Sequence, residues 1–168
     1  MPNILCFSRN RCTGVEMVDD HTMRSICRIQ DTLLDAFVEI QVRIPDLDIV
    51  RIKGEIARSR VGAGIDVSDQ LQKVIGSRVG PGIKKIVRGL LDWSPHGEQL
   101  ATLLDECANG IIMSFTRDVL LNAPDDKPGE KEYFSGMVRS NPRLYNSCAA
   151  LSKDSPLMEG LELDKALG

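Results

Sequence analysis

The sequence lacks the features that mark membrane and secreted proteins. No apolar run approaches the ~20 consecutive residues that a helix needs to cross a bilayer. The first residues, Met1 to Phe7, contain no basic region, and their apolar run is too short for a secretory signal peptide. We therefore expect a cytoplasmic protein with no membrane partner.

A strong excess of one charge is also missing. The chain has 24 acidic and 21 basic residues, which gives a formal net charge of −3 and no general attraction to nucleic acid. One small basic cluster is present, formed by Arg78, Lys84, Lys85 and Arg88. Phosphate binding usually recruits several more cations. We therefore expect no nucleic-acid partner and interpret the cluster as a solvated surface.

The cysteine and histidine patterns of metal sites and disulfide frameworks are missing as well. The five cysteines, Cys6, Cys12, Cys27, Cys107 and Cys148, are scattered, and no pair has C-x-x-C spacing. This odd, scattered set argues against a secreted disulfide framework. A structural zinc site needs four clustered ligands, and the chain has only two histidines. We predict no metal site, assign no cofactor, and expect reduced, mostly buried thiols.

The chain does contain enough apolar material for a folded core. Of its 168 residues, 42% are hydrophobic and 27% are charged, as is typical of a globular domain. We expect a single α+β domain over residues 1–151. Residues 152–168 form a tail that we expect to pack on the domain or on a second subunit, or to stay disordered.

The clearest single element is a long helix that begins near Ser94. Ser94 is a favourable N-cap residue, and Pro95 suits the first helical position. Apolar residues then recur every three or four positions, which indicates a helix with one buried face. They are Leu100, Leu103, Leu104, Cys107, Ala108, Ile111, Phe115 and Val119. Asn122 and Pro124 supply the end of this helix.

Strands are predicted ahead of the long helix. Apolar and polar residues alternate from Ala36 to Ile44 and from Val50 to Ile56, which indicates strands with one buried face. A weaker alternation runs from Met23 to Gln30. These segments predict an antiparallel meander of at least three strands. The first twenty residues have no clear assignment, apart from a candidate short strand at Ile4 to Phe7 and a polar turn around Arg9 to Arg11.

The remaining segments predict short helices and connections. Residues 58–64 read as a flexible connection, and short helices follow around 68–75 and 83–91, with Trp93 at the corner before the long helix. Residues 125–132 read as a solvated linker that cannot form a core. Strands come first and helices second. This order favours an α+β fold in which an antiparallel sheet of three or more strands carries its helices, including the long one, on one face.

Two segments carry a resemblance to a known family. At the start of the long helix, Leu100, Leu103 and Leu104 fit the apolar positions of a Gly-Cys-Thr-His-Leu-x-x-Leu-Leu motif, with Glu98 and Gln99 in place of its cysteine and histidine. Later, residues 147–150 fit a Ser/Thr-Cys-x-Ala segment. The chain thereby resembles bacterial domain-of-unknown-function family 2889 from the meander to Leu151. The resemblance implies a fold and a cytoplasmic location, but no activity.

The order of three strands, a short helix and a long helix is also similar, more faintly, to the iron–sulfur cluster scaffold family. In that family cysteines hold the cluster at the strand–helix junction and at the start of the long helix. Here residues 61–64 and 95–97 contain no cysteine. Because cluster ligation needs thiolates, this likeness implies at most a scaffold that has lost its ligands.

Six residues are candidates for ligand binding: His21, Arg58, His96, Glu98, Gln99 and Cys148. His96 could act as a ligand or a base beside Glu98 at the helix start. The carboxylates that precede His21 could orient it for acid–base work. Arg58 and the glycines that follow it could hold an anion on backbone N–H groups. Cys148 is the thiol of the segment that fits the family. For each residue the alternative is a purely structural role.

Three functions are compatible with the sequence. The first is a small-molecule-binding or assembly module that self-associates through the exposed half of the sheet and the tail, so we expect a small-molecule ligand and a homo-oligomer. The second is an enzyme that uses His21, His96, Glu98 or Cys148 for acid–base or thiol chemistry near the start of the long helix. The third is a degenerate metal or iron–sulfur carrier. The sequence does not decide whether the protein is an enzyme.

Overall fold

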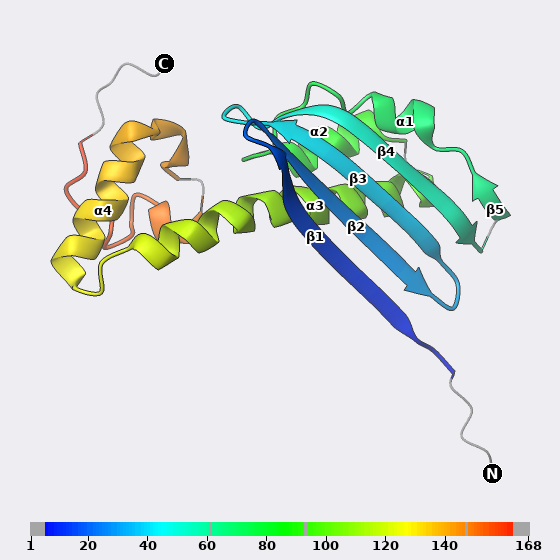
Figure 1. Ribbon diagram of the computed structural model, residues 1–168, viewed down its shortest axis with the longest axis horizontal. Coiled ribbons are helices and arrows are strands. Elements are labelled where there is room, and N and C mark those ends of the chain that lie inside the picture. Colours follow the sequence, from blue (N-terminus) through cyan, green and yellow to red (C-terminus); the bar gives the residue numbers. More distant parts are fainter. Residues whose placement is uncertain (1–5, 61, 93, 147, 163–168) are drawn as a thin grey trace, which may run out of the picture. The chain divides into compact units, whose positions relative to one another are not determined.

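The computed structural model describes residues 6–60, 62–92, 94–146 and 148–162 (Figure 1). The chain forms two compact units, which we describe separately: the sheet unit, Met1–Phe115, and the C-terminal unit, Thr116–Gly168. Helix α3 (Pro95–Asn122) contributes to both. Several expectations lie partly or wholly outside the described residues: the beginning of the short strand at Ile4, the corner at Trp93, Ser147 of the family segment and residues 163–168 of the tail. Cys6 and Phe7, the described part of the expected short strand, belong to no strand.

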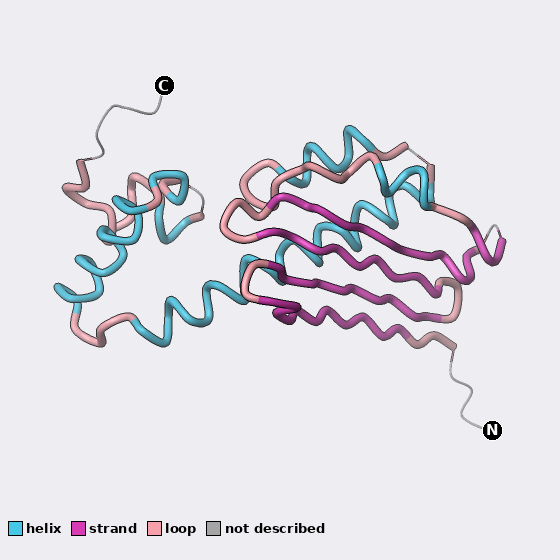
Figure 2. Tube along the Cα trace, turned by 45° about the horizontal axis from the view of Figure 1, so that its top comes forward, coloured by secondary structure: helices cyan, strands magenta, loops and turns pink. Residues whose placement is uncertain are grey.

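The sheet unit is built on five antiparallel strands that lie side by side in sequence order (Figure 2). They are β1 (Arg9–Asp19), β2 (Thr22–Asp31), β3 (Asp35–Arg43), β4 (Asp48–Ser59) and β5 (Gly62–Ile65). Each strand pairs with its sequence neighbour, so the sheet is a meander. The predicted antiparallel sheet is confirmed, and it has two strands beyond the minimum of three.

The alternating residues of the central strands give the sheet one buried and one polar face. Val38, Ile40 and Val42 of β3 are fully buried. The residues between them point to the other face, where the ammonium of Lys53 lies 3.2 Å from the carboxylate of Glu39. The two-residue period of a strand thus separates core from surface within each strand.

Helices cover the buried face of the sheet. They are α1 (Ser68–Gln72), α2 (Ile83–Leu90) and the part of α3 that belongs to the sheet unit (Figure 1). The predicted apolar stripe of α3 is buried from Leu100 to Ile111, whereas Phe115 is exposed. The α+β fold with a long helix against an antiparallel sheet is therefore confirmed. Within the described residues, none of the helices combines the length and the apolar character that a bilayer crossing requires.

A glycine allows α3 to approach the edge strand β1 closely. A Cβ atom at Gly110 would lie 3.0 Å from Cγ2 of Val15 and 3.1 Å from Cγ2 of Thr13, so a larger residue would push the strand away. One turn earlier, Glu106 of α3 forms an ion pair with Arg11 of β1 at 3.2 Å. Strand β1 is thus attached to the helix by its own side chains.

The structure corrects two expectations about the strands. Residues 9–11, which we expected in a turn, begin the strand β1. Val50, which we expected on the buried face of β4, is exposed, and Ile49 is buried in its place. The cause is a register shift between Gln41 and Val42 of β3, where the pairing with β4 skips a residue. Such a bulge moves the residues beyond it to the opposite face.

Two segments that read as connections form regular structure. The predicted flexible connection 58–64 contains the end of β4 and most of β5, with Arg58 opposite Ala63 in a hairpin. Most of the predicted linker 125–132 belongs to α4 (Lys127–Ser140). The side chain of Asp126 accepts a hydrogen bond from Gly129 N at 2.8 Å and caps this helix.

The C-terminal unit has a small hydrophobic cluster of its own. Besides α4 it contains two single-turn helices, η1 (Pro142–Leu144) and η2 (Ala149–Leu151). Phe134, Val138, Leu151 and Met158 are its buried apolar residues. Leu151 and Met158 therefore share one cluster across the boundary that we expected after residue 151. The division of the chain into a domain and a tail stays a prediction.

Candidate functional site

Hydrogen bonds fix the start of α3, where three candidate residues lie. Ser94 Oγ accepts a hydrogen bond from Gly97 N at 3.0 Å, as expected of an N-cap residue. The same hydroxyl donates to one oxygen of Asp92, and Gln70 of α1 donates to the other. The hydrogen bond from Ser94 holds the pKa of Asp92 below its usual range. The ionised Asp92 thus joins α1 to the first turn of α3.

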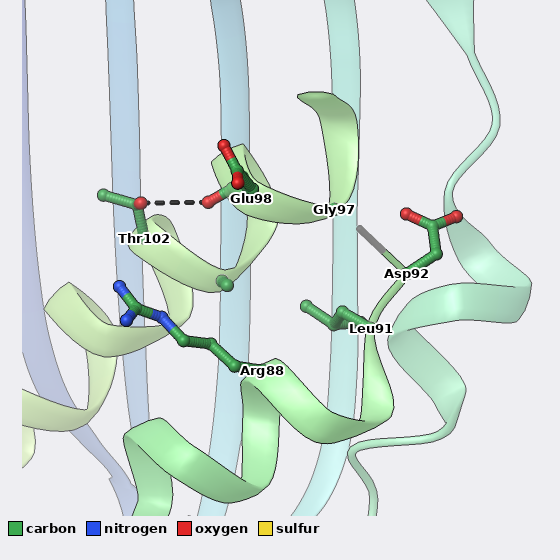
Figure 3. Close-up of a pocket in the computed structure, with 7 residues that line it drawn as sticks. Arg88, Leu91, Asp92, Gly97, Glu98 and Thr102 are labelled. Atoms are coloured by element: carbon green, nitrogen blue, oxygen red, sulfur yellow. Dashed lines mark hydrogen bonds between the residues drawn. The ribbon is translucent and has the colours of Figure 1, made fainter. Parts of the chain in front are cut away.

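A pocket of about 270 Å³ lies beside this helix start, on the side of α2 (Figure 3). Its lining residues are Arg88, Leu91, Asp92, Gly97, Glu98, Ala101 and Thr102. Figure 3 shows Arg88 reaching from α2 toward the turn of α3 that carries Glu98 and Thr102. We call it the α2-side pocket. Its two carboxylates outnumber its one guanidinium, so it does not favour an anion.

A second pocket, of about 290 Å³, lies on the side of β1, and we call it the β1-side pocket. Its lining residues are Arg11, Ile29, Leu34, Pro95, Glu98, Gln99, Thr102 and Leu103. They come from β1, β2, the β2–β3 turn and α3. Glu98 and Thr102 line both pockets, so the two hollows lie on either side of the same helix turn.

Gln99, a lining residue of the β1-side pocket, has a buried side-chain acceptor without a donor among the described residues. Its side-chain oxygen Oε1 is buried and has no hydrogen-bond partner among the described residues. Among the described residues, Oε1 of Gln70 is also buried without a hydrogen-bond partner, but Gln70 lines neither pocket. A buried acceptor that loses its water without gaining a donor costs free energy. A ligand that donates to Gln99 would recover it.

The charges around the β1-side pocket leave one carboxylate without an ion pair. Arg11 is paired with Glu106 at 3.2 Å, so its charge is largely compensated. In the described part of the chain, no ion pair involves Glu98, which is exposed at the pocket wall. The polar lining of this pocket thus includes one carboxylate without an ion pair among the described residues, that of Glu98, and one paired guanidinium, that of Arg11.

Asp31 holds the turn that supplies Leu34 to the β1-side pocket. Its oxygen Oδ1 accepts hydrogen bonds of 2.7 Å from the backbone N–H groups of Leu33 and Leu34. Its other oxygen accepts from Nε of Arg9 at 2.9 Å. These hydrogen bonds lower the pKa of Asp31 despite its burial, and the bond from Leu33 has the largest effect. The turn is therefore rigidly connected to the start of β1.

The structure places His96 in contact with Ser59, which follows the candidate Arg58 in β4. Nε2 of His96 lies 3.2 Å from Oγ of Ser59, at the end of β4. The same Ser59 hydroxyl donates to the carbonyl of Gly62 at 3.2 Å. Arg58 donates from Nη2 to the carbonyl of Asp31 at 2.6 Å. These contacts connect the β4–β5 hairpin to the helix start and to β2.

The other two candidates lie elsewhere. His21 is exposed in the β1–β2 turn, where its N–H donates to Asp19 Oδ1 at 2.8 Å. This turn is at the end of the sheet opposite Arg58, because Thr22 pairs with Arg43 whereas Asp35 pairs with Arg58. Cys148 is exposed in the C-terminal unit, directly before η2, and lines neither pocket.

The thiols are less buried than expected. Cys27 and Cys107 are buried, as predicted for Cys107, but Cys6, Cys12 and Cys148 are exposed. Burial raises the pKa of Cys107 to about 12 and also raises the pKa of Cys27, so both stay protonated near neutral pH. Among the described residues, no three His, Cys, Asp or Glu side chains gather closely enough to hold a metal ion.

Of the residues that line the two pockets, sequence reasoning named only Glu98 and Gln99 as candidates; the residues it missed include Arg11, Ile29, Leu34 and Arg88. Arg11 fell in a predicted polar turn, and Arg88 was interpreted as surface charge. No local signal places either residue beside Glu98, because their neighbourhood forms only when the strands and α2 pack against α3. Glu98 and Gln99 were found because the resemblance drew attention to the helix start.

Comparisons with protein-family models, curated proteins and solved structures found no match. The resemblance to domain-of-unknown-function family 2889 therefore stays a prediction, as does the fainter likeness to cluster scaffolds.

Proposed function

We propose that the protein is a small-molecule-binding module and that its ligand lies in the β1-side pocket. Gln99 lines this pocket, and its side-chain oxygen is buried without a hydrogen-bond partner among the described residues; together these observations support the proposal, and a ligand reaches the oxygen when the side-chain amide turns toward the pocket. An orphaned acceptor inside a fold is a cost, and a ligand that donates an N–H or O–H removes it. Glu98, the fourth residue of α3, lines both pockets and supplies a second acceptor.

The ligand class follows from the charge balance. Because Arg11 is already paired with Glu106, an anion entering the pocket would meet the unpaired carboxylate of Glu98. A cationic or neutral donor, such as an amine, would instead be attracted to Glu98 and would donate to Gln99. The pocket therefore favours amines over carboxylates.

The apolar residues of the pocket indicate the size and the apolar character of the remaining part of the ligand. Ile29, Leu34 and Leu103 supply the apolar part of the pocket lining. The volume of about 290 Å³ lies at the lower end of the range for small-molecule sites, which begins at roughly 300 Å³. We expect a branched aliphatic or small cyclic body that carries an amino group at one end.

The enzyme alternative has weaker support. Ser59 Oγ donates to the Gly62 carbonyl at 3.2 Å and lies equally far, 3.2 Å, from Nε2 of His96; with the hydroxyl proton on the carbonyl side, the imidazole N–H is the donor of the second contact. A histidine that activates a serine must accept from the hydroxyl instead. The contact between Ser59 and His96 is thus a structural one, which favours binding over catalysis as the role of this region.

A matched pair of ligands tests the proposal. Isobutylamine and isobutyrate share a branched apolar body and differ in the charged end group. We expect isobutylamine, titrated at millimolar concentration into the labelled full-length protein, to shift the NMR signals of the Gln99 side-chain amide and of the backbone at Glu98. Isobutyrate should leave these signals in place. Affinity in this range is what so few non-hydrogen atoms can provide.

The variant Gln99→Leu removes the acceptor and keeps an apolar wall. We expect roughly tenfold weaker amine binding, because one hydrogen bond to a charged donor is lost. Gln70→Leu is the control, since it removes the other unpartnered buried oxygen from a residue that lines neither pocket; it also removes the hydrogen bond to Asp92, so its fold is checked by circular dichroism, and amine binding should be unchanged. Equal responses to the two ligands, or unchanged binding in Gln99→Leu, would refute the proposal.

A further inference from the structure

Strand β1 has a free outer edge. It is an edge strand of eleven residues whose inner side pairs with β2. Among the described residues, no strand pairs with its outer side. An edge of this length presents a row of backbone N–H and C=O groups that can pair with another strand.

The usual devices that protect an edge are missing from most of β1. The strand contains no proline and no lysine, and its one irregularity lies at the far end, between Met17 and Asp19. Its two arginines are engaged within the chain, Arg9 with Asp31 at 2.8 Å and Arg11 with Glu106 at 3.2 Å. Residues 10–16 therefore form a regular edge that no described strand pairs with and no proline or lysine interrupts.

The charges of β1 are complementary to those of a second, antiparallel β1. Its beginning is basic, with Arg9 and Arg11, and its end is acidic, with Glu16 and Asp19. When two copies pair antiparallel about a two-fold axis at Gly14, Arg9 of each strand lies opposite Asp19 of the other, although Arg9 also pairs with Asp31 and Glu16 with Arg24 within each chain. In this register Cys12 of one copy is directly opposite Glu16 of the other, on the polar face.

The helical side of the same edge adds apolar surface. Glu106, Gly110 and Met113 follow one another at helical spacing on the side of α3 that faces β1, since the first two contact that strand. Met113 is 63% exposed, and Met17, farther along β1, is 53% exposed. A strand added to the β1 edge would cover part of this surface.

We propose that β1 binds β1 of a second copy of this chain, antiparallel and centred on Gly14, so that two five-stranded sheets join into one. A two-fold interface of this kind is self-complementary, which matches the charge pattern of the strand. The interaction differs from the one we expected from the sequence, which placed contacts on the sheet face and the tail. It does not depend on the ligand site proposed above.

Cross-linking at the symmetry axis tests the register. A Cβ atom at Gly14 would meet only Cγ2 of Ile26, at 4.0 Å, so Gly14→Cys fits the monomer. In a full-length background with serine at the exposed positions Cys6, Cys12 and Cys148, Gly14→Cys should give a disulfide-linked dimer on mild oxidation. Ala63→Cys, on the opposite edge strand β5, is the control and should stay unlinked.

Charge substitution tests the neighbouring pair. Cys12→Glu places like charges opposite each other twice in the dimer, and we expect a roughly tenfold higher dimer dissociation constant by sedimentation analysis. In the monomer the new carboxylate lies beside Arg28, its partner on β2, so folding should be retained. Cys12→Ser should dimerise like the wild type. The double variant with Glu16→Lys restores opposite charges and should recover dimerisation.

The outcomes are distinct. Wild-type dimers that Cys12→Glu weakens and Glu16→Lys restores support the proposal. If the wild-type protein sediments as a monomer up to high micromolar concentration, the proposal is overturned. The edge of β1 would then be available to pair with a strand of another protein. A dimer that is indifferent to Cys12→Glu, or that links through Ala63→Cys, overturns the proposal as well and assigns self-association to another surface.

Discussion

At the scale of single residues, close approaches decide which side chain a position accepts. Gly54 lies in β4, beneath α1. A Cβ atom there would lie 2.7 Å from the carbonyl oxygen of Phe37 and 2.8 Å from Cδ1 of Leu71. The first neighbour is backbone and cannot move aside without disturbing the ladder between β3 and β4. Nothing in the alternating sequence around Gly54 marks this constraint, because Leu71 arrives from a distant part of the chain.

The variant Gly54→Ala should therefore lower the free energy of unfolding by about 1–3 kcal/mol, the usual cost of forcing extra volume into a packed site. Gly14→Ala is the matched control, since its Cβ would make one ordinary contact at 4.0 Å, and it should change stability little. Urea unfolding followed by circular dichroism measures both. Equal stability of the two variants would contradict the packing argument.

At the scale of elements, the helix start is the part that the sequence describes best. Ser94 and Pro95 predicted where α3 begins, and Asn122 predicted where it ends, because caps and helix breakers act through the local backbone. The central strands were also predictable, since each buries one face and alternates accordingly. Strand β1 was missed because nearly all of its residues are exposed, which leaves no alternation to recognise.

We expect Ser94→Ala to lower the free energy of unfolding by about 1 kcal/mol, since it removes the hydrogen bond from Gly97 N to Ser94 Oγ. Ser94→Thr keeps a capping hydroxyl and should retain most of the stability. Thermal unfolding of the full-length variants measures the difference. If threonine destabilises as much as alanine does, the cap is not the source of the effect.

At the scale of the whole molecule, the chain has two separate hydrophobic clusters. One lies between the sheet and its helices, and the other joins α4 to the segment around Met158. Each cluster belongs to one of the two compact units, although α3 is a continuous helix through both. Units that bury separate clusters can open with different free energies.

Phe134→Ala should therefore act on the C-terminal unit alone. Phe134 is buried in the second cluster, and truncation of a buried phenylalanine costs about 3–5 kcal/mol. We expect hydrogen exchange to show faster exchange of amides in α4 and unchanged protection in β2, β3 and β4. Leu104→Ala, in the first cluster, should show the converse. Loss of protection in the sheet of Phe134→Ala would mean that the two units unfold as one.

The sequence by itself determined the fold class, the start and end of α3, the central strands and the absence of helices that could cross a membrane among the described residues. Each of these follows from the local backbone or from a repeating pattern within one segment. Only the tertiary structure brought Arg11, Leu34 and Gln99 to one pocket and placed β1 at an edge of the sheet, with no described strand on its outer side. Both features depend on which segments far apart in the chain become neighbours, and a pattern within one segment does not contain that information.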